Sequence, residues 1–150
     1  MAGNREREAG APAPAGNASD PAAVEAAFRK FSGRIVGPAD ADYDSARSVY
    51  NAMIDKSPAL IAQVGTVADV ALAVQVARDQ GLLLAIRGGG HNGGGLGTCD
   101  GGLVIDLAAL DTVDVDPEAK TVTVGGGCTW GQVDKATGAY GLATPSGIVS

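Results

Sequence analysis

The sequence is poor in aromatic side chains, in histidine and cysteine, and in net positive charge. Aromatic residues make up 4% of the 150 residues, so any core must be built from the Ala, Val, Leu and Ile that dominate the 45% hydrophobic fraction. The formal net charge is −6 and no basic patch is visible, which argues against nucleic acid and membranes as partners. No apolar run reaches the roughly 18 residues of a membrane span.

The few cysteines and the single histidine limit the chemistry further. One histidine and two distant cysteines, Cys99 and Cys128, meet no zinc-ligand spacing, so we predict no metal site. Two cysteines without an export signal are expected to be free thiols. The N-terminus lacks the apolar core of a secretory signal, and we therefore expect a cytoplasmic protein.

Composition divides the chain into three segments. Residues 1–19 contain Ala, Gly, Pro, Asn and charged residues without apolar periodicity, and they are predicted to be disordered. Residues 20–57 form a helical lead-in, which opens with Asp20 as N-cap and Pro21 at the first helical position. Residues 58–150 form the main domain and begin with a β-α-β pattern.

Short apolar runs predict strands in this domain, and capping residues predict two helices. The first helix begins after Thr66, with Asp69 completing a capping box, and ends at Gly81. The second begins at Thr129, with Gln132 in the matching position. The predicted strands cover residues 60–64, 82–86, 103–107, 112–115 and 121–124, with a turn at 116–118 between the last two.

The first of these helices carries an apolar stripe that predicts which side faces the core. Apolar residues recur along it at helical spacing, and this pattern is typical of a helix with one buried face. The predicted buried face consists of Val67, Val70, Ala71, Val74 and Ala77.

The most informative feature is a glycine-rich loop that contains the only histidine of the chain. Seven of the ten residues from 88 to 97 are glycine, and His91 lies among them. Glycine leaves backbone N–H groups bare, and a run of bare N–H groups forms a concave site for an anion, usually a phosphate. The loop lies between two predicted strands, so it projects from a sheet edge where α/β proteins commonly bind ligands. It therefore indicates a cofactor.

Two common phosphate motifs do not explain this loop. The chain has no G-x-x-x-x-G-K-[ST] sequence, which excludes a P-loop. A loose G-x-G-x-x-G match runs from Gly90 to Gly95, but such a match is nearly automatic among so many glycines. No convincing helix follows it, as a Rossmann turn would require.

Four motifs between Pro58 and Ser150 resemble those of a known family. They read R-G-G-G-H-N, G-G-L-V-I-D-L, V-G-G-G-C-T-W and G-L-A-T-P-S-G-I, in this order. The set resembles the FAD-linked oxidases of the berberine bridge enzyme-like group, in the vanillyl-alcohol oxidase or PCMH-type flavoprotein superfamily. Upstream, Tyr50 and Asn51 resemble a W-N pair that often precedes the domain. The resemblance implies an α+β fold, namely the N-terminal, βαβ-containing part of a PCMH-type FAD-binding domain, left incomplete here.

The resemblance also implies which residues hold FAD. Backbone amides from Gly88 to Asn92 would face the pyrophosphate, and His91 would form a covalent bond to the flavin 8α-methyl group. Arg87 either neutralises phosphate charge or forms a salt bridge at a strand end, and Asp106 is structural and caps the turn that follows it. The implied cofactor-binding residues are Arg87, Gly88, Gly89, Gly90, His91, Asn92 and Gly93 in the loop, and Thr144, Pro145, Ser146 and Gly147 along the flavin.

A second covalent tether is not expected. Many members of the group attach the flavin through a cysteine as well, at a position that Val149 occupies here. Cys128 lies well upstream and does not match that position. The resemblance therefore implies FAD held by a single histidyl bond.

The resemblance implies an enzyme, an oxidase that removes hydride from a C–H or CH–OH group of a small organic substrate and passes the electrons to oxygen. A flavin dehydrogenase with another acceptor, and a truncated non-catalytic nucleotide-binding module, are the alternatives. No catalytic base can be named within the 150 residues. Because members of the group continue with the rest of the FAD domain and a substrate domain, we expect this chain to be a fragment that is inactive alone and holds little flavin.

Overall fold

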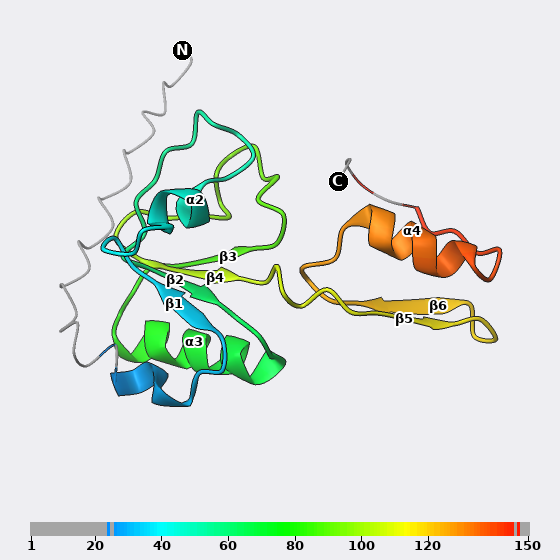
Figure 1. Cartoon of the computed structure of the whole chain (residues 1–150), viewed down its shortest axis with the longest axis horizontal. Helices are drawn as coiled ribbons and strands as arrows, with labels where there is room; N and C mark the ends of the chain where they lie inside the picture. Colours follow the sequence, from blue (N-terminus) through cyan, green and yellow to red (C-terminus); the bar gives the residue numbers. More distant parts are fainter. Residues whose placement is uncertain (1–23, 25, 146, 148–150) are drawn as a thin grey trace, which may run out of the picture.

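The computed structural model describes residues 24, 26–145 and 147, and Figure 1 shows two successive parts, a four-stranded sheet with helices and a hairpin with one helix. The first part contains η1 (Phe28–Lys30, a 3-10 turn), β1 (Arg34–Val36), α2 (Tyr43–Arg47), β2 (Leu60–Gln63), α3 (Val67–Asp79), β3 (Leu84–Arg87) and β4 (Leu103–Asp106). The second contains β5 (Val113–Asp116), β6 (Thr121–Val124) and α4 (Trp130–Gly138). The predicted N-cap Asp20 and its neighbour Pro21 lie outside the described residues.

The larger sheet has the strand order β1-β2-β4-β3. Strands β2, β4 and β3 are parallel, and β1 is antiparallel to β2. The register pairs both Gln63 and Arg87 with Asp106, so the carboxyl ends of the three parallel strands lie together at one end of the sheet. Strand β3 is at the edge, so the glycine-rich loop leaves an edge strand at that end, as predicted.

The core occupies both faces of this sheet and is almost entirely aliphatic, as the composition predicts. Helices η1 and α3 cover one face and α2 covers the other (Figure 1). The first cluster contains Val24, Phe28, Ala62, Val64, Ala73, Val76, Ala77, Leu103 and Ile105. The second contains Val36, Tyr43, Ile61, Ala85, Cys99 and Val104.

Helix α3 begins at its predicted capping box, and the structure confirms both reciprocal hydrogen bonds. The Thr66 hydroxyl accepts from the Asp69 backbone N–H at 3.2 Å, and the Asp69 carboxylate accepts from the Thr66 N–H at 2.9 Å. These bonds satisfy two of the N–H groups that a helix start would otherwise leave without a partner.

The predicted buried face of α3 is wrong for most of its residues. Val67 is 77% exposed, Val74 is 41% exposed and Ala71 is exposed, whereas Ala77 is buried as predicted. The first turn is anchored inward, because the Asp69 carboxylate accepts hydrogen bonds from the Ser32 and Gly65 N–H groups. The residues four, seven and eight positions after Asp69 share its face of the helix and therefore pack toward the sheet. The buried residues of the helix are Asp69, Ala73, Val76 and Ala77.

The observed buried face predicts that two valines of α3 contribute unequally to the free energy of unfolding. Val76→Ala removes two buried methyl groups from the core and should lower the free energy of unfolding by about 2 kcal/mol. Val67→Ala removes exposed atoms and should change it by less than about 0.5 kcal/mol. Urea unfolding of both variants measures this, and an equal loss from the two would contradict the observed face.

Asp69 joins three segments of the first part. Its carboxylate accepts hydrogen bonds from the Ser32 N–H at 2.9 Å, the Ser32 hydroxyl at 2.7 Å, the Gly65 N–H at 3.0 Å and the Thr66 N–H at 2.9 Å. Burial opposes ionisation of this carboxyl, but the four hydrogen bonds outweigh it and lower its pKa to about 2. Asp69 thereby fixes the chain before β1 against the start of α3.

The second part is a hairpin with a helix beside it. The predicted turn is confirmed, because the Asp116 carboxylate accepts from the N–H groups of Glu118 and Ala119 at 3.0 and 2.9 Å. Helix α4 begins at Thr129, whose N–H donates to the Gln132 side chain at 2.7 Å, as predicted. Helix α4 packs against β5. Nowhere in the described ranges is a helix both long enough and apolar enough to span a membrane.

Two glycines that follow β6 pack closely against the chain that leads from β4 to the hairpin. A Cβ added to Gly127 would lie 2.1 Å from the Leu107 carbonyl oxygen, and one added to Gly125 would lie 2.0 Å from that of Leu110. The Gly127 N–H donates to the Leu110 carbonyl at 2.9 Å. The chain can cross itself this closely only without side chains at these positions.

Candidate functional site

The glycine-rich loop and the end of β3 form an open cavity of about 260 Å³. The predicted residues from Arg87 to Asn92 all line it. Ile86, Leu96 and Gly97 complete the lining, so the cavity combines bare backbone, one buried cation and one imidazole.

The loop presents seven consecutive backbone N–H groups without a protein partner. Within the described residues, none of the N–H groups from 88 to 94 donates a hydrogen bond. The loop is closed further on, where the Gly95 N–H donates to the Asn92 carbonyl and the Leu96 N–H donates to the Asn92 side-chain oxygen, both at 3.0 Å. These residues are exposed or half-buried, so solvent can satisfy the donors, and those from 88 to 92, which line the cavity, are available to an anion.

Two of the loop glycines allow close approaches, and a third faces open space. A Cβ on Gly88 would lie 2.7 Å from the Gly126 carbonyl oxygen, and a Cβ on Gly89 would lie 2.8 Å from the His91 ring. A Cβ on Gly93 would meet nothing within 4 Å. Gly90 has a φ of +72°, which a side chain would strain. The first half of the loop therefore depends on glycine for its shape.

A buried ion pair forms the base of the loop. The Arg87 guanidinium donates to the Asp106 carboxylate at 2.7 Å, between side chains that are 7% and 11% exposed. Arg87 also donates to the Ser48 carbonyl at 3.1 Å, and Asp106 accepts from the Ala108 N–H at 3.1 Å. The predicted turn cap by Asp106 is thus confirmed. Of the two roles given for Arg87, the salt bridge is present, and contact with phosphate stays a prediction.

His91 is exposed, and an aromatic ring lies against it. The ring centroids of Tyr50 and His91 are 4.7 Å apart, with an angle of 31° between the planes. The Tyr50 N–H donates to the Gly90 carbonyl at 3.3 Å, and the Asn51 amide donates to the Gly93 carbonyl at 3.4 Å. Sequence reasoning assigned no contact to these two residues, and its only signal was their likeness to a W-N pair.

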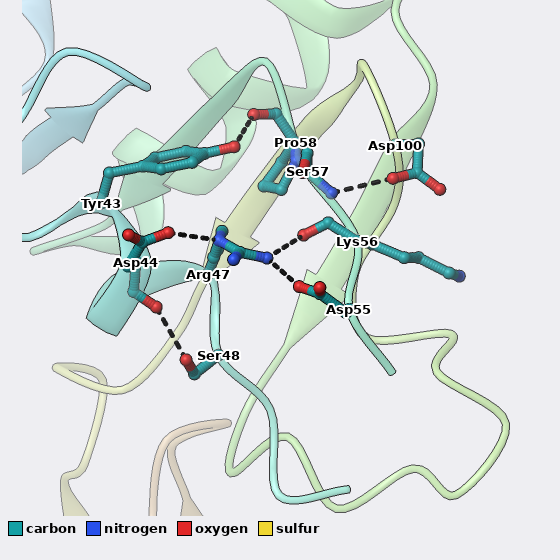
Figure 2. A network of polar contacts seen from close by, with 9 residues as sticks. All are labelled: Tyr43, Asp44, Arg47, Ser48, Asp55, Lys56, Ser57, Pro58 and Asp100. Atoms are coloured by element: carbon teal, nitrogen blue, oxygen red, sulfur yellow. Dashed lines mark hydrogen bonds and ion pairs between the residues drawn. The ribbon is translucent and has the colours of Figure 1, made fainter. Parts of the chain in front are cut away.

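The segment that carries Tyr50 is held at both ends by the network in Figure 2. Arg47 contacts the carboxylates of Asp44 and Asp55, and their hydrogen bonds raise the pKa of its guanidinium. Further on, Lys56 donates to the carbonyls of Gly95 and Thr98 at 2.9 and 3.3 Å. The remaining bonds of the network join Ser48 to Asp44, Arg47 to Lys56, Ser57 to Asp100 and Tyr43 to Pro58.

The other predicted residues, Gly93 among them, do not line this cavity. Thr144 is half-buried, and Pro145 and Gly147 are exposed; within the described residues, no hydrogen bond or ion pair joins them to the glycine-rich loop. Ser146 and Val149 lie outside the described residues. Their placement along a flavin stays a prediction.

The two cysteines are separate thiols in the structure. Cys99 is buried in the core and Cys128 is half-buried. Burial raises the pKa of the Cys99 thiol. Among the described residues, no three His, Cys, Asp or Glu side chains gather as a metal site would require.

Comparison with known proteins shows to which class of protein the chain belongs. A family model described as an FAD binding domain matches residues 58–149. The chain is 34% identical, over 79% of its length, to (R)-6-hydroxynicotine oxidase of Paenarthrobacter nicotinovorans. Its fold matches a carbohydrate oxidase from Microdochium nivale (TM-score 0.73, 28% identity, 83% of this chain and 27% of that one). It also matches a variant of Physcomitrella patens BBE-like 1 (TM-score 0.70, 32% identity, 75% and 25%).

The architecture and the glycine-rich loop thus define a flavoprotein domain of the PCMH type. The chain belongs to the FAD binding domain family, and the predicted kinship with the berberine bridge enzyme-like group is confirmed. FAD is therefore the cofactor of this domain. The chain spans only 26%, 22% and 21% of the length of three curated relatives that it matches.

Proposed function

We propose that the glycine-rich loop binds the pyrophosphate of FAD and that His91 attaches the flavin covalently, as part of an FAD-dependent oxidase. One observation carries this proposal, namely that the backbone N–H groups from 88 to 94, on either side of the exposed His91 imidazole, have no acceptor among the described residues. Side chains at Gly88 or Gly89 would clash within the loop, and glycine at these positions leaves the backbone open to the close approach that a phosphate needs.

FAD, when bound, supplies the acceptor for a hydride taken from the substrate. The chain's own residues bind and hold it. The N–H groups from 88 to 92 donate to phosphate oxygens, and charge-assisted bonds of this kind are the stronger ones. Arg87 lines the same cavity, and the ion pair with Asp106 holds its guanidinium in place. His91, at the exposed side of the loop, provides a ring nitrogen for the tether.

The oxidase activity and the type of substrate rest on the relatives. One is named a 6-hydroxynicotine oxidase and another a carbohydrate oxidase. These names support a reaction in which a small organic molecule loses hydride to the flavin and oxygen accepts the electrons. No described residue of this chain is assigned as the catalytic base.

The role of the phosphate cradle, that is, the backbone N–H groups from 88 to 92, can be tested by FAD binding. Gly89→Val should weaken FAD binding at least tenfold, since its side chain would displace the His91 ring and cover neighbouring N–H groups. The measurement is a titration of flavin fluorescence with each purified protein. Gly131→Ala is the control, because a Cβ at Gly131 in α4 meets nothing within 4 Å. Equal affinity in the Gly89→Val variant and the control would overturn the phosphate role.

A further inference from the structure

The segment from Ser48 to Lys56 lies before the region that the FAD family model matches, yet it contacts the glycine-rich loop along its whole length. The contacts begin at the base, where the Ser48 carbonyl accepts from Arg87, and end where the Lys56 ammonium donates to Gly95 and Thr98. Between them, the Tyr50 N–H bonds Gly90. This segment therefore fixes the loop from outside the matched domain.

Tyr50 is the residue of this segment whose side chain contacts His91, the proposed point of flavin attachment. Its ring lies 4.7 Å from the His91 ring at a shallow angle of 31°, and its N–H holds the residue immediately before His91. The Tyr50 side chain is 77% exposed, so burial of the ring in the core does not explain its position. His91 has glycine on its N-terminal side at positions 88 to 90, and no side chain there restrains its rotation. Within the described residues, the ring that lies against His91 is that of Tyr50.

We propose that Tyr50 is a positioning residue for flavin attachment, which stacks on the His91 ring and holds its nitrogen toward the flavin. The inference rests on the proposed function, since it assumes that His91 forms the tether. In that step a ring nitrogen of His91 bonds to the 8α-carbon. One methyl hydrogen and the imidazole N–H hydrogen leave as two protons and two electrons in total, and dioxygen takes these up to become hydrogen peroxide. Tyr50 takes no part in the transfer and acts only through the orientation of the imidazole.

The experiment measures covalent attachment at increasing FAD concentration, using the full-length protein that contains this chain, in air. Acid-precipitated protein is assayed for flavin fluorescence over time, which yields a limiting rate and a half-saturating FAD concentration. Tyr50→Ala should lower the limiting rate at least tenfold and leave the half-saturating concentration within about twofold of wild type. Tyr50→Phe keeps the ring and should retain the wild-type rate. Met53→Ala is the matched control, because Met53 lies in the same segment and its side chain is 87% exposed.

A second measurement needs no flavin. His91 is the only histidine, so its ring C–H resonances in the NMR spectrum belong to one residue. The stacked tyrosine should shift them, and Tyr50→Ala should remove that shift while Met53→Ala leaves it in place.

The possible outcomes distinguish the attachment of flavin through His91 from the positioning role of Tyr50. No covalent flavin in the wild-type protein would overturn the attachment through His91, and the role of Tyr50 with it. Covalent flavin in wild type with an unchanged limiting rate in Tyr50→Ala would overturn the role of Tyr50 alone. A rise in the half-saturating concentration at an unchanged limiting rate would show that Tyr50 only supports the cradle. Loss of attachment in Tyr50→Phe would likewise overturn the stacking role.

Discussion

His91→Ala is expected to abolish covalent attachment of flavin, because the chain contains no other histidine and the loop offers no other nucleophile. The full-length protein that contains this chain, incubated with FAD and denatured, should keep flavin fluorescence in its gel band, and the variant should show none. The bare N–H groups stay in place in the variant, so it should still bind FAD reversibly. The expected change is therefore in the bond rather than in the cradle.

The control for this experiment is the half-buried Cys128. Its thiol donates to the Thr112 carbonyl at 3.2 Å, in the hairpin part of the chain. Cys128→Ala should leave the fluorescent band as strong as in wild type. A band that survived in His91→Ala and vanished in Cys128→Ala would move the tether to the thiol.

Asp69→Ala is expected to destabilise the fold by about 3–4 kcal/mol. The carboxylate is buried and accepts four hydrogen bonds, and its loss leaves these donors without their partner. Asp79→Ala is a matched control on the same helix, since its side chain is 54% exposed, and should cost less than about 1 kcal/mol. Urea unfolding at neutral pH compares the two variants, and similar losses would contradict the structural role given to Asp69.

Asp69 also makes the free energy of unfolding depend on pH, and the structure gives the direction of that dependence. Folding lowers the pKa of Asp69 from its ordinary value of 3.8 to about 2. The folded state therefore binds the proton more weakly than the unfolded state does, and the stabilisation is complete above about pH 4. It is lost as the pH falls from 3.8 toward 2. Asp69→Ala should flatten the stability profile in this window, and an unchanged profile would show that other carboxyls cause it.

Local signals predicted local structure well in this chain. The capping boxes at Thr66 and Thr129 and the turn at Asp116 depend on residues three or fewer positions apart, and all three are present. The glycine-rich loop was also found from sequence, because a loop after a buried strand must leave the sheet at its end. Family motifs supplied the identity of the ligand, which composition and periodicity did not.

The errors and omissions concern contacts between distant segments. The buried face of α3 was misjudged because it was placed from apolar spacing alone, whereas the polar Asp69, bonded to Ser32, turns its own face of the helix toward the sheet. The stack between Tyr50 and His91 joins residues 41 positions apart, at an exposed surface where no apolar pattern exists. Charged residues at the ends of β3 and β4 did signal the Arg87 salt bridge, but only the register showed its partner.

The lead-in before Pro58 has a consequence for protein engineering. A transplant or gene fusion that began at residue 58 would keep all four family motifs, but it would remove β1 and expose the edge of β2. It would also take away Ser32 from Asp69 and Tyr50 from His91. Chimeric flavoenzymes built from this chain should therefore be joined upstream of η1, so that the domain and the segment that supports its loop are inherited as one piece.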